Sequence, residues 1–238
     1  RVLFRSRTPN GWLSCSVGYA RHRKELQVAL LARPRHEFPV MLQERVVGPG
    51  VGIFVCYDRG KMVAVFSHRR LREKPPWGGV SVLCESTEVP ADARECAERL
   101  LEDLNWHGVA MVEFKRDARD GLPKLMEINA RFWGSLQLAL DAGVDFPNIL
   151  LDPLCDPVGG PMPSFRAGVK SRWLWGDFDS LLLRLRSRGD WAPQDGRGRL
   201  RAIAQFLQFT SRDLHYDNPK RDDVRPWLFE TRRRLWPW

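Results

Sequence analysis

The segment VAMVEFKRDARDGLPKLMEINARFWGS, Val109–Ser135, decides how this chain folds. Two β-rich runs, 108–115 and 123–131, flank the charged turn RDARDG. Such a pattern predicts two strands joined as a hairpin. Folding the hairpin symmetrically about residue 120 sets three cross-strand pairs: Glu113 with Glu127, Val112 with Ile128, and Phe114 with Met126.

The two faces of this hairpin differ in chemistry, because residues two apart on a strand share a face. One face carries side chains suited to a core, namely Val112, Phe114, Met126 and Ile128. The other face carries Glu113, Glu127 and Asn129, and Arg131 follows on the same alternation. A plain core strand would present solvated residues there, so the polar face requires its own explanation.

Two carboxylates directly opposite each other on a sheet repel, and a divalent cation between them reverses the sign of the interaction. Glu113, Glu127 and the Asn129 oxygen form an all-oxygen ligand set, which suits Mg²⁺ or Mn²⁺ rather than Zn²⁺. Arg131 offers a planar fork for a phosphate oxygen. A solvent-facing strand pair, with its acids balanced by Lys115, Lys124 and Arg131, explains the spacing equally well. Spacing alone leaves both interpretations open.

The rest of the first 150 residues alternates strands and helices. Asp58-Arg59-Gly60 separates two β-rich runs and predicts a second hairpin, 52–58 with 61–71. Pro90 opens a helix over 90–105, with Asp92 near its positive end. Further predicted elements are a helix over 22–31, a strand over 38–47 that runs into Gly48-Pro49-Gly50, and a short helix over 135–143 that ends at Gly143.

The residue composition changes after Pro147. A Pro- and Gly-rich stretch reads as a connector, and two basic amphipathic helices are predicted beyond it, over 179–189 and 199–212. Six of the ten Trp follow residue 170. Such a tail can lie on a membrane surface, but more often these helices pack on their own domain.

The composition is that of a folded globular protein. The chain has 238 residues, of which 43% are hydrophobic, and its net charge of +9 is carried mainly by Arg. That charge fits nucleic acid, a membrane surface or an anionic substrate, and also an ordinary Arg-rich solvated surface. The apolar stretches are too short to span a bilayer. The five Cys are scattered without a CxxC pair, which indicates reduced thiols in a cytoplasmic protein.

Segment 109–135 closely resembles the metal-binding end of ATP-grasp enzymes, in particular the carbamoyl-phosphate-synthase-like carboxylate–amine ligases. The resemblance implies that Glu113, Glu127 and Asn129 hold two Mg²⁺ ions on the phosphates of ATP. It also implies that Arg131 lies beside the transferring phosphate. The resemblance covers residues 8–150.

Two other segments take part in the resemblance. VMLQERVVGPGVGIFV, 40–55, is similar to the adenine hinge of the family, which implies adenine contacts for Gln43, Glu44 and Val46. SHRRLREKPPWGGVSV, 67–82, is similar to the segment that approaches the acyl-phosphate substrate. There the candidates are Arg70 and the Gly78-Gly79 loop. His68 could act as a base, but a hydrogen-bonded structural histidine is the more common case.

The resemblance implies an α+β ATP-grasp fold, in which two α+β subdomains with antiparallel sheets sandwich ATP, followed by a helical C-terminal extension. The expected organisation is a partial small subdomain over 8–46, a large subdomain over 47–150, a linker over 151–168 and the extension over 169–238. Residues 1–7 read as a translated sequencing adapter.

The sequence departs from the family pattern at two places. Gly50 stands where many members have an acid that holds the ribose hydroxyls. The family also has a phosphate-binding Lys on the strand before a flexible loop that SRTPNGW, 6–12, resembles, and RVLFRS supplies none. We therefore expect this chain to be a fragment that lacks that Lys and the preceding domain, and that binds nucleotide weakly by itself.

The predicted function is an ATP- and Mg²⁺-dependent ligase. It would activate a small-molecule carboxylate as an acyl phosphate for attack by an amine or a similar nucleophile. No nucleic-acid partner or transmembrane segment is expected, and a homo-oligomer is compatible with the sequence. Two alternatives stay open: a basic module for nucleic acid or a membrane surface with a degenerate metal hairpin, and a biotin-carboxylase-like or carbamoyl-phosphate-forming enzyme.

Overall fold

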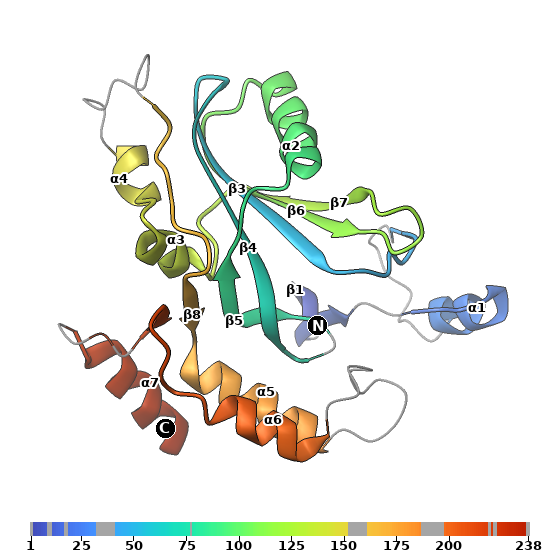
Figure 1. The fold of residues 1–238 in the computed structure, drawn as a ribbon. Coiled ribbons are helices and arrows are strands. Elements are labelled where there is room, and N and C mark those ends of the chain that lie inside the picture. The colour runs from blue at the N-terminus through green and yellow to red at the C-terminus, as the bar shows by residue number, and fades with distance from the viewer. Residues whose placement is uncertain are drawn as a thin grey trace. The chain divides into compact units, whose positions relative to one another are not determined.

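The computed structural model describes residues 2–8, 11–16, 19–31, 41–76, 78–151, 161–186, 198–218, 220 and 223–236. The chain forms two compact units, 1–45 and 46–238 (Figure 1). The predicted division into subdomains, linker and extension remains a prediction.

The first unit contains a two-stranded antiparallel sheet and one helix. Strands β1 (Val2–Thr8) and β2 (Gly11–Ser16) pair with each other, and α1 (Arg23–Leu31) confirms the predicted helix. The strand predicted over 38–47 is wrong for its described part, because 41–47 form no regular element. No sheet partner buries these residues: Met41 is 81% exposed and Val47 is 61% exposed.

The second unit is built on a seven-stranded sheet with the order β7-β6-β3-β4-β5-β8-β9. Both predicted hairpins are present, and β8 and β9 pair in parallel while the other neighbours are antiparallel. The strands are β3 (Gly50–Asp58), β4 (Lys61–Lys74), β5 (Val80–Ser86), β6 (Gly108–Arg116), β7 (Pro123–Asn129), β8 (Lys170–Arg172) and β9 (Leu214–Tyr216).

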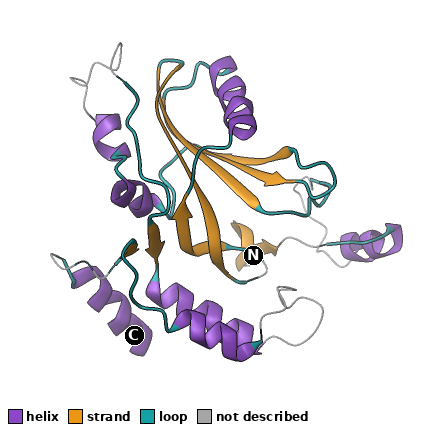
Figure 2. Ribbon diagram, in the orientation of Figure 1, coloured by secondary structure: helices purple, strands orange, loops and turns teal. Residues whose placement is uncertain are grey.

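Helix α2 (Ala91–Asp103) covers one face of this sheet (Figure 2). Its buried side chains Ala93, Ala97 and Leu101 are small or apolar and recur at helical spacing. They pack with the buried side chains of the central strands: Ile53, Val55, Tyr57, Val65, Ala110, Val112 and Phe114. The predicted start at Pro90 is confirmed, since Pro90 is the N-cap residue.

Helices α3 (Leu136–Ala142) and α4 (Phe146–Leu151) cover the opposite face. The segment after β7 supplies Trp133, whose ring lies 4.5 Å from that of Phe54 and 5.0 Å from that of Phe146, measured between centroids. Helix α3 ends as predicted at Gly143, which has a positive φ of 115° and donates its N–H to the last carbonyls of the helix. The polar hairpin face lies on this side of the sheet, beside the aromatic core.

The C-terminal part is helical, as predicted, and it packs on its own sheet. Helix α5 (Leu174–Arg186) lies against β4, where the Ser180 hydroxyl donates to the Glu73 carbonyl at 2.7 Å. Helices α6 (Arg199–Phe206) and α7 (Arg225–Leu235) follow, and α6 ends earlier than predicted. The same part supplies β8 and β9, which the sequence analysis missed. Within the described ranges, no helix is long and apolar enough to cross a membrane.

Candidate active site

The register of β6 and β7 brings the two predicted acids face to face. Glu113 pairs with Glu127 and Val112 with Ile128, as the symmetric hairpin predicts. The predicted partner of Phe114 is wrong, because Phe114 pairs with Leu125 rather than Met126. A β-bulge after Glu113 adds one residue on β7 and shifts the pairs on the turn side of the acids by one position.

Asn129 and Arg131 continue this polar face. The Asn129 amide donates from Nδ2 to Oε1 of Glu127 at 3.0 Å, and its Oδ1 lies 3.4 Å from Nη2 of Arg131. Nη1 of Arg131 donates to the Phe132 carbonyl at 3.0 Å. These bonds hold an acid, an amide and a guanidinium in a row along one edge of the sheet. Glu127 and Arg131 remain exposed, so both stay accessible to a ligand.

Arg70 joins the same site from β4, two strands away. Its Nη2 lies 2.8 Å from Oε1 of Glu113, and its Nη1 lies 3.1 Å from Oε1 of Glu73. The intervening strand carries Gly50 and Gly52 on this stretch, and a Cβ built on Gly50 would come within 3.9 Å of Nη1 of Arg70. A longer side chain at Gly50 would occupy the path that Arg70 takes across β3, whereas a Cβ on Gly52 would come within 2.9 Å of the Phe54 ring.

Burial lowers the pKa of the Arg70 guanidinium, but the charges of Glu113 and Glu73 outweigh this effect and hold the pKa above its usual value. Arg70 therefore stays cationic at any physiological pH. Its Nη1 also lies 3.5 Å from the Gly79 carbonyl, so the predicted Gly78-Gly79 loop contacts Arg70. A Cβ on Gly79 would come within 2.1 Å of the Lys74 carbonyl oxygen, so this position requires glycine.

The residues present fit a hard divalent cation. Glu113 and Glu127 face each other, and the Asn129 side-chain oxygen lies on the same face, which is an all-oxygen donor set. Among the described residues, no three His, Cys, Asp or Glu side chains come close enough to hold a metal by themselves. A set of two carboxylates and one amide matches the way Mg²⁺ is bound, with substrate phosphates completing the coordination.

His68 belongs to the same face but is enclosed by the core. It is 4% exposed, its ring stacks on Phe54 with centroids 4.6 Å apart, and its Nε2 lies 2.7 Å from Oγ of Ser135. Burial, reinforced by the charge of Arg70, lowers the pKa of His68 to about 3. A neutral, hydrogen-bonded histidine is the structural role that the sequence analysis favoured over a base.

The predicted adenine residues fall on both sides of the boundary between the two units. Gln43 and Glu44 lie in the unit 1–45, and Val46 begins the second unit. Their adenine contacts stay a prediction. The residues that sequence reasoning missed are Glu73, which contacts Arg70, and Ser135, which contacts His68. Ser135 is the last residue of the segment 109–135, so its place at the end of the hairpin motif was the available signal.

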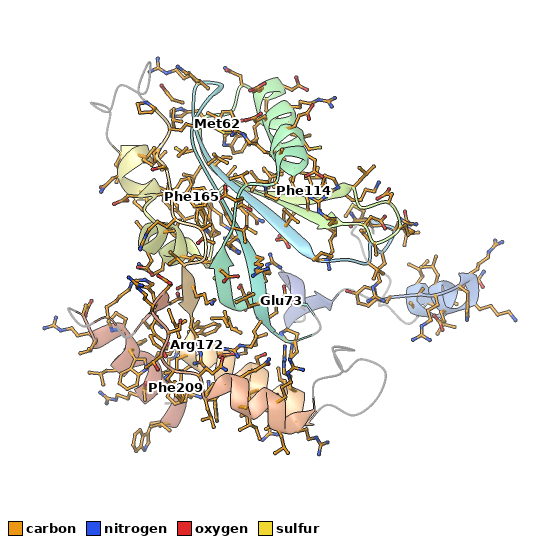
Figure 3. The ribbon with its side chains drawn as sticks, viewed as in Figure 1. Met62, Glu73, Phe114, Phe165, Arg172 and Phe209 are labelled. Carbon is orange, nitrogen blue, oxygen red and sulfur yellow. The ribbon has the colours of Figure 1, made fainter. Side chains whose placement is uncertain are left out.

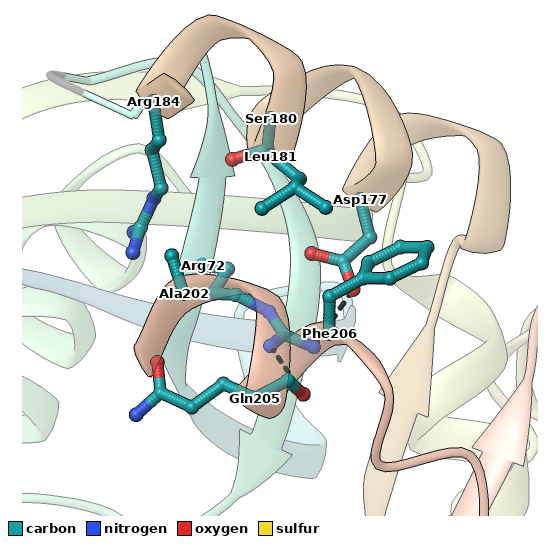
Figure 4. A pocket seen from close by; sticks show the side chains of 8 residues that line it. All are labelled: Arg72, Asp177, Ser180, Leu181, Arg184, Ala202, Gln205 and Phe206. Carbon is teal, nitrogen blue, oxygen red and sulfur yellow. Dashed lines mark hydrogen bonds and ion pairs between the residues drawn. The ribbon is translucent and has the colours of Figure 1, made fainter. Parts of the chain in front are cut away.

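A small hollow lies elsewhere, between α5, α6 and β4 (Figure 4). Arg72 and Asp177 point toward each other there, with Nη2 and Oδ2 2.7 Å apart. Burial lowers the pKa of Arg72 and raises the pKa of Asp177, while their mutual attraction opposes both shifts. None of the residues that line the hollow belongs to the polar face of the hairpin. Its lining residues are Arg72, Asp177, Ser180, Leu181, Arg184, Ala202, Gln205 and Phe206.

Comparison with known proteins decides the family. The family described as "ATP-grasp in the biosynthetic pathway with Ter operon" matches residues 36–175. The chain belongs to this ATP-grasp family. The resemblance of the hairpin to ATP-grasp enzymes and the predicted α+β ATP-grasp fold are thereby confirmed. No curated protein matches the chain.

Solved structures similar to this ATP-grasp chain include three enzymes. The phosphoribosylaminoimidazole carboxylase ATPase subunit from Aquifex aeolicus is 22% identical, with a TM-score of 0.39 over 51% of this chain and 38% of its own. The L-amino acid ligase from Bacillus licheniformis is 18% identical, with a TM-score of 0.36 over 45% and 29%. The biotin carboxylase from Campylobacter jejuni is 15% identical, with a TM-score of 0.40 over 54% and 30%. The chain thus spans less than two fifths of each of these structures.

Proposed function

We propose that the protein is an ATP- and Mg²⁺-dependent ligase that activates a small-molecule carboxylate as an acyl phosphate. The supporting observation is the pair of facing acids, Glu113 and Glu127, with Asn129 and Arg131 in line beside them and Arg70 reaching in from β4. Membership of an ATP-grasp family supports ATP as the phosphoryl donor.

Glu113, Glu127 and the Asn129 oxygen are the residues that would hold Mg²⁺ or Mn²⁺. The bound cation would neutralise charge on the ATP phosphates as the γ-phosphoryl group moves. Asn129 Nδ2 donates to Glu127, so the amide would have to turn for its oxygen to face a cation that Glu127 also holds. The bulge beside Glu113 fixes the local twist of β6 and β7. It thereby sets the relative orientation of the Glu113 and Glu127 side chains.

Two arginines would stabilise the charge that develops on the transferring group. Arg131 is exposed and is held through the Phe132 carbonyl and Asn129, which leaves guanidinium N–H groups for a phosphate oxygen. Arg70 stays cationic and is fixed by Glu113, Glu73 and the Gly79 carbonyl. Preorganised donors of this kind stabilise the transition state without further reorganisation.

The reaction needs no nucleophile from the protein. A carboxylate oxygen of the substrate attacks the γ-phosphorus, the bond to the β–γ bridging oxygen breaks, and ADP leaves. An amine then attacks the acyl carbon, phosphate leaves, and the amine loses one proton. The described buried thiols are unsuited to covalent catalysis, because burial raises the pKa of Cys56 to about 11 and that of Cys84 to about 12.

Substitution of the metal ligands tests this function in the complete protein. Glu127→Gln and Asn129→Ala should reduce Mg²⁺-dependent ADP formation by at least about 100-fold, because the charge of the phosphates is no longer offset. Lys124→Ala is the matched control, since Lys124 is on the same strand and pairs with Asp120 in the turn. Activity retained in Asn129→Ala, together with unchanged Mg²⁺ affinity, contradicts the assignment.

A further inference from the structure

A row of paired residues connects the candidate metal site to His68. Glu127 pairs with Glu113, Glu113 with Gly52, and Gly52 with His68, across β7, β6, β3 and β4. Directly paired residues lie on the same face of a sheet. Adjacent strands are about 4.8 Å apart, so the backbone of His68 lies about 10 Å from that of Glu113. Gly52 contributes no side chain between them.

The buried surroundings of His68 decide which ring nitrogen carries the proton. Nε2 meets the Ser135 hydroxyl at 2.7 Å, whereas Nδ1 is buried and has no hydrogen-bond partner in the described part of the chain. A proton on Nδ1 would leave a buried N–H without an acceptor, and such orphaned donors are rare in folded proteins. On this ground the proton of the neutral ring is assigned to Nε2, which donates it to Oγ of Ser135.

That bond leaves the hydroxyl proton of Ser135 available to a ligand. Ser135 is the N-cap residue of α3, yet its side chain makes no capping hydrogen bond, and the residue is partly exposed. It follows Arg131 by four residues, in the segment that leaves the metal-binding strand. A hydroxyl that accepts from a fixed donor has its own proton directed away from that donor.

We propose that Ser135 is a further catalytic residue, whose hydroxyl donates a hydrogen bond to an anionic oxygen of the transferring phosphoryl group, and that His68 is its positioning residue. This inference rests on the proposed function, because it assigns the phosphoryl group to the face that carries Glu113 and Glu127. Phe54 stacks on the histidine ring and Trp133 packs against Phe54, so the hydroxyl is oriented before any substrate arrives.

The test compares two ligands in the full-length protein by titration calorimetry. Mg²⁺·ADP reports on the nucleotide and metal site, and Mg²⁺·ADP with aluminium fluoride mimics the transferring phosphoryl group. Ser135→Ala should weaken capture of the aluminium fluoride complex at least about tenfold and change the Kd of Mg²⁺·ADP by less than about twofold, as expected for one hydrogen bond to a charged group. Ser135→Thr keeps the hydroxyl and should restore capture.

Two further variants separate positioning from packing. Ser211→Ala is the matched control, since Ser211 is an exposed serine in the segment before β9, outside the candidate site, and this variant should bind both ligands normally. His68→Gln keeps a donor near the Nε2 position and should retain more of the capture than His68→Leu.

Three results overturn the inference: unchanged capture by Ser135→Ala, equal weakening of both ligands by that variant, or binding of Mg²⁺·ADP by the unsubstituted protein without aluminium fluoride capture. Failure of the unsubstituted protein to bind Mg²⁺·ADP at all overturns the proposed function, and this inference with it.

Discussion

Two clusters of arginines and carboxylates in the second unit, one around Arg172 and one that includes Arg131, use their hydrogen-bond donors in opposite ways. Arg172 is fully buried: its Nε donates to Asp177 at 2.7 Å, and its two Nη atoms donate to the carbonyls of Gln208 and Phe206. Arg172 and Phe209 lie near each other in the C-terminal part (Figure 3). Arg131 is exposed, with one bond to Phe132 and a longer one to Asn129. Every nitrogen of the Arg172 guanidinium has an acceptor within the protein. The Arg131 guanidinium keeps N–H groups that can donate to a ligand.

The difference separates a structural cluster from a binding cluster. Arg172 also stacks against the rings of Phe206 and Phe209, at 4.6 and 5.1 Å from their centroids, so it joins β8 to the end of α6. Arg72 reaches the same Asp177 from β4 and donates to the Gln205 carbonyl. A high density of charged side chains therefore does not by itself indicate a binding site. Hydrogen-bond donors and acceptors that the protein leaves unused do indicate one.

The largest effect is expected from breaking the closed cluster. Arg172→Ala leaves Asp177 buried with one cation fewer and frees the carbonyls at the end of α6. Removing one partner of a buried ion pair costs about 3–5 kcal/mol. Urea denaturation should show this loss in the free energy of unfolding, whereas Arg131→Ala should unfold at nearly the same urea concentration as the unsubstituted chain. Equal stability of the two variants contradicts the distinction.

The second-largest effect is expected on catalytic activity, which should depend on the exposed Arg131 rather than on the buried Arg172. In the complete protein, Arg131→Ala removes a donor aimed at developing phosphate charge and should lower kcat for ADP formation about 100-fold. Arg131→Lys keeps the charge but loses the planar fork, so it should recover only part of the rate. Steady-state kinetics with saturating Mg²⁺·ATP checks this result. A normal kcat in Arg131→Ala would remove Arg131 from the proposed mechanism.

The sequence predicted the open cluster better than the closed one, for a physical reason. Alternation along β7 and a short turn fix which residues face Glu113, so local pattern is sufficient for the acids. The symmetric hairpin missed the bulge, because an extra residue on one strand leaves no mark in a binary pattern. Arg172 stands in a three-residue strand, too short for periodicity, and its two carbonyl acceptors come from residues 34 and 36 positions later in the chain. Arg172 is buried by tertiary contacts, which its basic local sequence does not show.

His68 shows the limit of what local sequence predicts. The sequence supplied a histidine beside two arginines, which suggested either a base or a structural role, and only the fold shows the Phe54 ring and the Ser135 hydroxyl that enclose it. Local sequence predicts which face a residue occupies. It does not predict whether a segment 67 residues further along the chain will cover that face.

The smallest effect is the pH dependence that this enclosure creates. Burial, with a further contribution from Arg70, lowers the pKa of His68 to about 3 in the folded chain, against about 6.5 in the unfolded chain. Between these values the unfolded state binds a proton that the folded state excludes, so this contribution to stability is present above pH 6.5 and is lost as the pH falls toward 3. Between pH 7 and pH 5 the loss should be about 2 kcal/mol. His68→Gln cannot take up this proton, so the difference in free energy of unfolding between the two proteins should shift by about that amount over the same range. Parallel pH profiles in urea denaturation would show instead that His68 titrates normally, and that the face around Ser135 is open to water like the surroundings of Arg131.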